Sequence, residues 1–361
     1  MRAAVCYEYS KPLVIEEVDI DPPQKGEVKV RLAATAICHS DIHCVRGDFG
    51  GFPPLPFVPG HESSGYVEEV GENVTSVKQG DAVVVSLLAS CGQCLYCTTG
   101  SPNLCEAMWP LLTGTRLRNK RGQRLNTNRK MANFAEYVIV DESQLVKIQK
   151  EMPMDQAALL ACGVITGFGA VVNRAQVRPL SSVVIIGTGG VGLNSVQGAF
   201  FSGANPIIAV DISDYKLKAA RDFGATHTIN ANKEDAVKAV QQLTSGRGAD
   251  YVFVTVGNSL AMQQGFAMSA KRGTTVIVGA APIKEQLTIS PFDFIEMEKT
   301  LTGAAMGSTR LSVDVPRLMA LYQAGRLKLD ELITDRYSLD QVDEAMEATE
   351  HGEALRNLLV F

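Results

Sequence analysis

A glycine-rich segment between an apolar strand pattern and a helical pattern constrains the fold of this chain most strongly. The segment SSVVIIGTGGVGLNSV, residues 181–196, contains Gly187, Gly189 and Gly192. In dinucleotide-binding βαβ units the first glycine permits a tight turn and the second lets the backbone approach a pyrophosphate. The third allows the helix to pack closely on the strand. The segment therefore predicts a dinucleotide site, with a purely structural glycine turn in a doubly wound sheet as the alternative.

An aspartate ends the next apolar strand pattern. NPIIAVD closes at Asp211, 19 residues after Gly192. A carboxylate at this place accepts hydrogen bonds from the adenosine ribose hydroxyls. It also repels a 2′-phosphate, so the sequence favours NAD over NADP.

The sequence shows two different patterns of expected secondary structure along its length. Its 361 residues exceed what one hydrophobic core usually supports. Residues 1–150 hold short β-type runs punctuated by glycine, proline and aspartate, which predict an all-β body. Beyond about residue 155, strand patterns alternate with helical patterns, which predicts βαβ units on a parallel sheet. Helices near 313–325 and 339–351 and a final strand in LRNLLVF complete the expectation.

Charge and hydropathy limit the classes of partner. The net charge of −5 gives no overall basis for binding nucleic acid or an anionic membrane. The basic segment 115–130 is interpreted as a solvated loop because it has no aromatic residue for base stacking. The N-terminus lacks an apolar signal region, and no apolar run approaches the roughly 18 residues of a spanning helix. We therefore expect a cytoplasmic protein, in which clustered cysteines favour metal binding or catalysis over disulfides.

Four of the eight cysteines lie in one short segment. SCGQCLYCTTGSPNLCE contains Cys91, Cys94, Cys97 and Cys105 with the spacing C-x2-C-x2-C-x7-C. Four thiolates can close a tetrahedron on zinc, and such a closed site is structural. Disulfides or an iron–sulfur cluster are the alternatives, and iron–sulfur spacing usually differs. The segment predicts a zinc-stabilised lobe.

A second metal site could assemble from distant residues. Cys38 lies in AICHSDIHC, His61 in GHESSG and Cys162 in LLACGVITG. Two cysteines, one histidine and a free position match the geometry of catalytic zinc. Spacing alone does not establish that the three meet. Each one taken singly is better explained as a buried cysteine or a surface histidine.

Taken together, these segments resemble the zinc-dependent medium-chain alcohol dehydrogenases over almost the whole chain. The matching pieces are CHSDIH at 38–43, GHE at 60–62, the four-cysteine lobe, ACGVITG at 161–167, GTGGVG at 187–192, VDI at 210–212 and LRNLLVF. The resemblance implies an α/β protein with a GroES-like β-rich catalytic domain at 1–163 and 306–361 and a structural zinc lobe near 88–110. It also implies a Rossmann NAD-binding domain with a doubly wound parallel sheet at 164–305. Residues 106–135 look like the longer lobe of dimeric members, which favours a homodimer.

The resemblance also implies catalytic roles. Cys38, His61 and Cys162 look like the ligands of a catalytic zinc, the second of two per chain, with Asp41 orienting the His61 ring. Glu62 is similar to the glutamate behind the metal. Zinc would activate the alcohol as an alkoxide, and hydride would pass to the nicotinamide. The proton would leave through Ser40, the coenzyme ribose and His43.

The coenzyme contacts are also carried over from the resemblance. Thr166 and Val191 look like residues that press on the nicotinamide, Lys216 like a ribose contact and Arg356 like a pyrophosphate contact. His39 stands where many members have an arginine on the pyrophosphate. The full expected set is His39, Thr166, Gly187, Gly189, Gly190, Val191, Gly192, Asp211, Lys216, Val278 and Arg356.

The substrate is expected to be a small alcohol or aldehyde. Leu87, Ala280 and Ala305 fall where family members carry pocket residues that are often larger, and Ser40 replaces a commoner threonine. This favours medium-chain or aryl substrates. Trp109 stands where glutathione-dependent formaldehyde dehydrogenases carry an arginine, which disfavours that activity. Simple surface packing of Trp109 is the alternative.

Other activities remain as alternatives. A formaldehyde dismutase with permanently bound NAD is compatible with the motifs. A zinc-free reductase of the superfamily would lack both cysteine sets, and a polyol dehydrogenase usually has a glutamate in place of Cys162. A non-enzymatic structural protein on this fold would not need an intact ligand set and proton relay.

Overall fold

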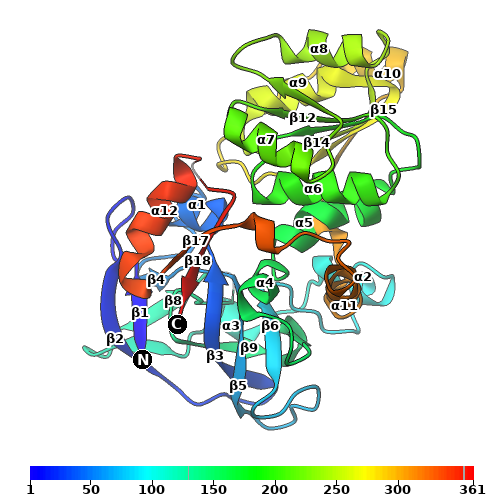
Figure 1. Ribbon diagram of the computed structural model, residues 1–361. Helices are drawn as coiled ribbons and strands as arrows, with labels where there is room; N and C mark the ends of the chain where they lie inside the picture. Colours follow the sequence, from blue (N-terminus) through cyan, green and yellow to red (C-terminus); the bar gives the residue numbers. More distant parts are fainter. Residues whose placement is uncertain (129, 353) are drawn as a thin grey trace. The chain divides into compact units, whose positions relative to one another are not determined.

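The β-rich and the α/β parts of the sequence fold as separate units in the computed structural model, which describes residues 1–128, 130–352 and 354–361. Unit 1 consists of Met1–Cys162 and Arg310–Phe361, and unit 2 consists of Gly163–Thr309. Figure 1 shows that the first and last segments of the chain, blue and red, lie together in unit 1. The chain returns to unit 1 at Arg310, a few residues later than expected. Thr309, the last residue of unit 2, donates a hydrogen bond to the carbonyl of Ile165 in the same unit.

Unit 1 is built on two sheets. The larger sheet has the strand order β10-β6-β5-β3-β18-β17, and β9 pairs with β3 beside this path. The smaller sheet has the order β1-β2-β7-β8-β4. The strands of the larger sheet are β3 (Glu27–Ala36), β5 (Glu62–Val70), β6 (Ala82–Ser86), β9 (Tyr137–Asp141), β10 (Leu145–Lys147), β17 (Ile333–Tyr337) and β18 (Arg356–Val360). Those of the smaller sheet are β1 (Arg2–Val5), β2 (Val14–Ile20), β4 (Phe57–Val58), β7 (Leu117–Asn119) and β8 (Arg124–Thr127).

Strand β3 shows why these residues form a sheet with one buried face. Val28, Val30 and Leu32 alternate with Lys29 and Arg31 along the strand. Successive side chains of a strand point to opposite faces, so this alternation buries the apolar set and leaves the charged set accessible. The three apolar residues belong to one core cluster with β5, β6 and β9 residues.

The helices of unit 1 connect the strands. They are α1 (His39–Arg46), α2 (Leu95–Thr98), α3 (Pro110–Thr113), α4 (Met154–Leu159), α11 (Leu311–Gln323) and α12 (Val342–Glu350). Short 3₁₀ turns are η1 (Pro102–Leu104), η2 (Glu142–Gln144), η5 (Asp330–Leu332) and η6 (Leu339–Gln341). Helix α1 directly follows β3, and that junction carries several of the candidate site residues.

Unit 2 contains a six-stranded sheet in the order β13-β12-β11-β14-β15-β16, with every pairing parallel. The strands are β11 (Val183–Ile186), β12 (Ile207–Asp211), β13 (His227–Asn230), β14 (Ala249–Val254), β15 (Ser269–Ile277) and β16 (Thr300–Gly303). The order reverses between β11 and β14, which is where doubly wound sheets bind ligands at the carboxyl ends of their strands. The predicted fold class is confirmed.

Helices surround this parallel sheet (Figure 1). They are α5 (Gly163–Gly169), α6 (Gly190–Phe201), α7 (Asp214–Asp222), α8 (Ala236–Leu243), α9 (Ser259–Met268) and α10 (Pro291–Met297), with the π-helical turn η3 (Ala170–Ala175) and the turn η4 (Ala305–Ser308). The central strands are apolar at nearly every position because both of their faces are covered.

The basic segment 115–130 differs from the expected loop. It contains β7 and β8, which pair antiparallel with Leu117 opposite Leu125. Both leucines are buried, so the segment supplies two short strands to the smaller sheet. Two of its charges are paired, Arg116 with Glu27 and Lys120 with Asp19.

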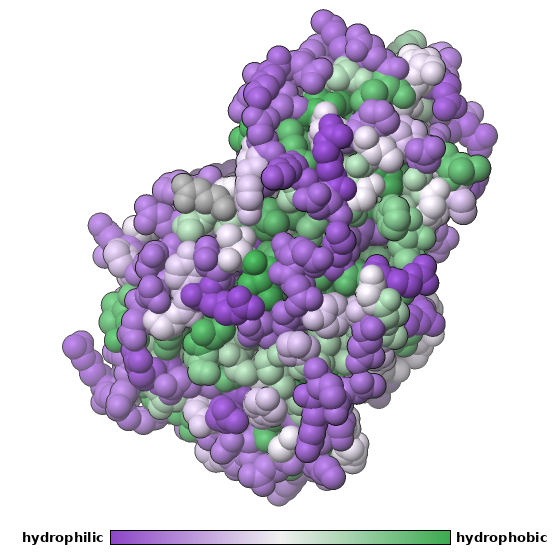
Figure 2. All heavy atoms as spheres, viewed as in Figure 1, coloured by the Kyte–Doolittle hydropathy of each residue, from purple (hydrophilic) through white to green (hydrophobic). Residues whose placement is uncertain are grey.

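The outer surface mixes polar and apolar side chains. Figure 2 shows hydrophilic and hydrophobic residues interspersed over the visible face. Among the residues that the structure describes, no helix has both the length and the apolar character needed to cross a membrane.

The glycine loop gives a matched test of packing. A Cβ at Gly192 would lie 1.8 Å from the Gly187 carbonyl oxygen and 3.0 Å from the Thr255 hydroxyl. We expect Gly192→Ala to lower the unfolding free energy by about 1–3 kcal/mol through overpacking. A Cβ at Gly189 would meet nothing within 4 Å. Gly189→Ala should therefore stay within about 0.5 kcal/mol of the parent chain. Urea unfolding followed by circular dichroism checks both, and equal losses would contradict this packing argument.

Candidate active site

The first turn of α1 places three candidate residues next to one another. Cys38 is the residue before the helix, with extended backbone angles, and Asp41 accepts a hydrogen bond from its backbone N–H at 3.3 Å. The Cys38 side chain in turn faces the backbone N–H of Asp41, which completes a capping box. The capping box fixes the path of the chain from β3 into α1. The Ser40 hydroxyl lies 3.2 Å from the Cys38 sulfur and 3.4 Å from Nε2 of His61.

The turn before β5 holds His61 in one orientation. Gly60 has φ +93°, a left-handed conformation that glycine adopts without cost. Nδ1 of His61 lies 2.9 Å from Oδ1 of Asp41, and the Gly60 N–H donates to the same oxygen at 3.1 Å. Both side chains are buried. A carboxylate can only accept here, so His61 carries its proton on Nδ1 and presents Nε2 on the other side of the ring.

Cys38, His61, Glu62 and Cys162 form a cluster within unit 1. Each residue offers one possible ligand atom, and these atoms all lie within 4.8 Å of one another. Cys162 comes from the end of the segment that follows α4, so the four residues come from three separate parts of the chain. The structure thus brings together the three residues expected to hold a catalytic zinc.

A buried ion pair stands beside this cluster. The Arg356 guanidinium contacts Oε1 of Glu62, and both side chains are almost fully buried. Arg356 is the first residue of β18, next to β3 in the larger sheet. The structure therefore places Arg356 against Glu62. Its contact with a coenzyme pyrophosphate stays a prediction.

The proximity of these groups shifts their titration. Hydrogen bonding from Cys162 and the nearby imidazole lower the pKa of the Cys38 thiol well below its usual value. Hydrogen bonding to Cys38 and burial raise the pKa of Cys162. Burial opposes the charged form of His61, but the Asp41 carboxylate prevails and raises its pKa well above the usual range. Burial raises the pKa of Glu62 to about 7, against the opposing charge of Arg356.

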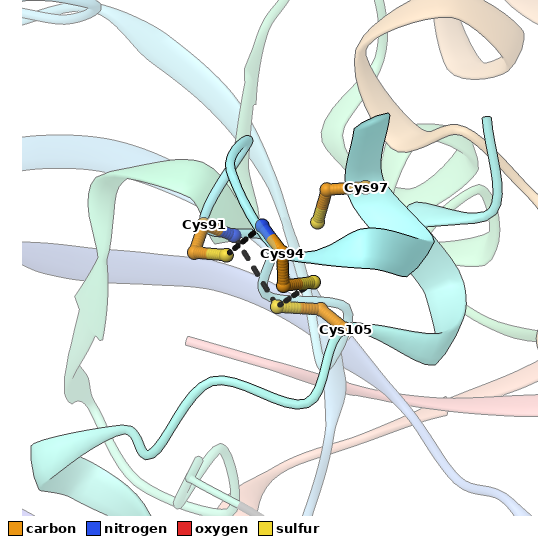
Figure 3. Close-up of side chains that lie close together, drawn as sticks. All are labelled: Cys91, Cys94, Cys97 and Cys105. Carbon is orange, nitrogen blue, oxygen red and sulfur yellow. Dashed lines mark hydrogen bonds between the residues drawn. The ribbon is translucent and has the colours of Figure 1, made fainter. Parts of the chain in front are cut away.

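The four-cysteine lobe forms a second cluster in unit 1. The sulfurs of Cys91, Cys94, Cys97 and Cys105 lie within 4.8 Å of one another. Figure 3 shows them facing a common space, with Cys97 on α2 and the others on the flanking loops. A tetrahedral zinc with bonds of about 2.3 Å needs sulfurs about 3.8 Å apart, and Cys94 and Cys105 are separated by 3.9 Å.

Backbone groups already favour thiolates in this lobe. The N–H groups of Cys97 and Glu106 lower the pKa of Cys94 to about 6. The N–H of Cys94 donates to the Cys91 sulfur at 3.3 Å, and the N–H of Cys91 donates to the Cys105 sulfur at the same distance. Desolvation instead raises the pKa of Cys97 to about 12. A metal cation would offset this cost, so the donor set fits zinc.

In unit 2 the glycine loop joins β11 to α6. Gly187 has φ +87°, and Gly189 precedes the first residue of α6, Gly190. Oδ2 of Asp211 accepts hydrogen bonds from the backbone N–H of Thr188 at 2.6 Å and from its hydroxyl at 3.0 Å. The Asp211 carboxylate at the end of β12 is therefore fixed against the glycine loop.

The remaining coenzyme candidates lie in both units. In unit 2, Thr166 is buried in α5 and donates toward the Met306 sulfur at 3.6 Å. Val191 lies in the first turn of α6, Lys216 in the first turn of α7, and Val278 just after β15. In unit 1, His39 is exposed at the start of α1. Their contacts with a coenzyme stay predictions.

Comparisons with known proteins agree with this arrangement. Residues 24–150 match the profile of the alcohol dehydrogenase GroES-like domain, and residues 190–324 match that of zinc-binding dehydrogenases. The NDMA-dependent alcohol dehydrogenase of Amycolatopsis methanolica is 38% identical over 99% of this chain and 98% of its own length. The chain belongs to the zinc-dependent medium-chain alcohol dehydrogenase family.

Solved structures show the same family over the full length. Benzyl alcohol dehydrogenase from Acinetobacter calcoaceticus aligns with a TM-score of 0.91 and 32% identity, covering 100% of this chain and 99% of that one. A protein described as a zinc-binding dehydrogenase from Sinorhizobium meliloti, bound to NADP, aligns with a TM-score of 0.82 and 26% identity. That alignment covers 100% of this chain and 99% of the other.

The structure adds site residues that the sequence did not reveal. Asp48 accepts from Nδ1 of His43 at 2.7 Å, and Phe49 packs near the same ring. Asn128 donates to Oδ1 of Asp41 at 3.0 Å. Asp48 follows α1 by two residues and could have been suspected. Asn128 lies 87 positions from Asp41, and no local pattern connects them.

Zinc binding at Cys38, His61 and Cys162 should release protons. Neighbouring groups raise the pKa values of His61 and Cys162 above their ordinary values, whereas the pKa of Cys38 is lowered. Metal ligands must be deprotonated, so zinc binding should release protons from His61 and Cys162 and should tighten as pH rises.

Calorimetry in buffers of different ionisation enthalpy measures this release in a chain that carries zinc only in the four-cysteine lobe. The control variant Cys162→Ala lacks one of these proton sources and should release fewer protons than the parent chain. A zinc affinity that does not change with pH would contradict the expectation.

Proposed function

We propose that the protein is a zinc-requiring, NAD-linked alcohol dehydrogenase that interconverts alcohols with aldehydes or ketones. The observation that carries the proposal is the Cys38–His61–Cys162 cluster. Asp41 accepts a hydrogen bond from Nδ1 of His61, so Nε2 is the ring nitrogen left to bind a metal. Two sulfurs and one imidazole leave a tetrahedral zinc one position for substrate. The four-cysteine lobe offers no such position and is proposed as structural.

Zinc supplies a Lewis acid that favours loss of the alcohol proton and polarises a carbonyl in the reverse reaction. Ser40 Oγ, beside the Cys38 sulfur and the His61 ring, is proposed to hydrogen-bond the substrate oxygen. His43 donates from Nδ1 to Asp48, so Nε2 is the ring nitrogen that can take up a proton. The side chain of His43 is 21% exposed, which supports exchange of that proton with water.

The coenzyme is proposed to bind at the glycine loop of unit 2. The loop stands at the reversal of strand order, and α6 begins there. The first N–H groups of a helix have no acceptor within the helix and favour an anionic pyrophosphate. Asp211 supports NAD because its carboxylate would repel a 2′-phosphate. The relative from Sinorhizobium meliloti was solved with NADP, so coenzyme choice needs a direct measurement.

Medium-chain or aryl alcohols are the proposed substrates. The resemblance assigns Leu87, Ala280 and Ala305 to positions where family members often carry larger substrate-pocket residues, which supports these substrates. The benzyl alcohol dehydrogenase relative supports the aryl class.

One comparison favours a second form of the activity, in which the coenzyme stays bound and is reoxidised in place. The relative from Amycolatopsis methanolica is described as NDMA-dependent. Benzyl alcohol oxidation assayed with NAD alone and with NDMA added would distinguish release of reduced coenzyme from reoxidation of coenzyme that stays bound. Turnover only with NDMA would favour the second form.

The two cysteine sets should respond differently to mutation. Cys38→Ala removes one ligand of the open site and should abolish turnover while the lobe keeps its zinc. Cys97→Ala removes one ligand of the closed site and should mainly lower stability, since lobe folding is coupled to metal binding. Metal analysis, benzyl alcohol oxidation and thermal unfolding of both variants make the comparison. Full activity with one zinc per chain would disprove the proposed function.

Asp211 should set the preference between NAD and NADP. Asp211→Ser removes the charge that repels a 2′-phosphate and the acceptor for the ribose hydroxyls. We expect the ratio of NADP to NAD affinity to rise about 10- to 100-fold, as for loss of a hydrogen-bonded charge. Fluorescence titration with both reduced coenzymes measures it.

Thr188→Val is the matched control, because it removes one hydroxyl contact of Asp211 and keeps the carboxylate. It should leave the ratio nearly unchanged. An unaltered ratio in Asp211→Ser would remove the assigned role.

A further inference from the structure

The buried carboxylate of Asp41 is held by four N–H groups. Oδ1 accepts from the Gly60 N–H at 3.1 Å, from Nδ1 of His61 at 2.9 Å and from Nδ2 of Asn128 at 3.0 Å. Oδ2 accepts from the Cys38 N–H at 3.3 Å. Three donors belong to the segments that carry Cys38 and His61 themselves. Asn128 alone comes from a different part of the chain.

Strand pairing brings Asn128 to this place. β8 runs parallel to β4, with Asn126 opposite Phe57 and Thr127 opposite Val58. One step further along, Asn128 comes beside the turn at Pro59 and Gly60, just before His61. Its backbone N–H donates to the Met131 carbonyl at 2.7 Å, and its carbonyl accepts from the Met131 N–H at 3.2 Å. The backbone of Asn128 is therefore fixed independently of the site.

The amide of Asn128 has one reasonable orientation. A carboxylate cannot donate, so the NH₂ group must face Asp41. The amide oxygen then faces the thiol of Cys44, whose sulfur lies 3.5 Å away. Asn128 is 2% exposed and Asp41 is 0% exposed, so water cannot easily replace this contact.

We propose that Asn128 is a positioning residue for the Cys38–His61–Cys162 site, and that it acts through Asp41. The inference rests on the proposed function, because it assumes that these three residues bind zinc. The amide fixes the rotation of the Asp41 carboxylate, which in turn fixes the plane of the His61 ring. Without it, Oδ1 loses one of three donors in a site closed to water. The carboxylate is then free to turn toward its remaining donors.

Asn128→Ala tests the proposal, and Asn119→Ala is its matched control. Asn119 is also a buried asparagine of unit 1, and its amide donates to the Tyr7 hydroxyl at 2.8 Å, away from the cluster. Loss of a partner in the outer shell of a metal site typically costs 10- to 100-fold in affinity or activity. Asn128 contacts Asp41 and not His61 itself, so a smaller effect is expected. In Asn128→Ala zinc should leave the Cys38–His61–Cys162 site about 3- to 10-fold faster than in the parent chain.

Zinc release into a chromogenic chelator, followed over time, provides the readout. The phase missing in Cys38→Ala belongs to the open site, and the other phase reports the four-cysteine lobe. The expected result is a faster open-site phase in Asn128→Ala alone, with lobe release unchanged. Co²⁺ loaded into the open site should also show shifted visible bands in Asn128→Ala and parent-like bands in Asn119→Ala.

The outcomes separate the two proposals. If the parent chain shows no open-site phase, the proposed function fails. If the parent shows it and Asn128→Ala releases zinc at the parent rate, or Asn119→Ala accelerates it equally, the positioning role is overturned. Asn128→Ser, measured in the same way, decides the matter if Asn128→Ala does not fold.

Discussion

Unit 1 depends on a set of ionisable groups that are buried together. Asp41, His61, Glu62 and Arg356 are all almost fully removed from water. An isolated buried charge is strongly destabilising, so such groups persist only when each has a partner. His61 is paired with Asp41 and Arg356 with Glu62. Cys38 and Cys162 lie beside these pairs and complete the cluster. Removing one charged member of a pair would leave its partner buried without an opposite charge.

Sheet register explains why these residues converge. In the larger sheet Thr35 of β3 lies opposite Ser63 of β5, and Ala36 of β3 lies opposite Leu358 of β18. Cys38 follows the end of β3, Glu62 begins β5 and Arg356 begins β18, so all three fall at one end of adjacent strands. The carbonyl of Glu62 also accepts from the Thr35 hydroxyl at 2.9 Å, which fixes that end of the pairing. The site is thus a product of antiparallel pairing in one unit.

Local patterns carried most of what the sequence could predict. The glycine loop and the four-cysteine spacing act over short stretches, so their geometry follows from the chain itself. Cys38, His61 and Cys162 became a candidate set only through resemblance, since nothing in their spacing brings them together. The positions of Asn128 and of the Arg356–Glu62 contact depend on which strands pair with each other. The sequence around each residue does not reveal that pairing. The short strands β13 and β16 have four residues each and gave no distinct pattern.

Charge balance explains how this cluster can exist both with and without a cation. The lowered pKa of Cys38 favours its thiolate, and the raised pKa values of His61 and Cys162 favour their protonated forms. A divalent cation would replace the protons of His61 and Cys162, so the net charge of the cluster would not change. Arg356 and Glu62 form an ion pair beside this cluster. A buried site pays heavily for any change in net charge, and this exchange requires none. The balance also bears on Asp41. If a cation replaced the proton on Nε2 of His61, Asp41 would no longer face a charged imidazolium, and its N–H donors would still stabilise its negative charge.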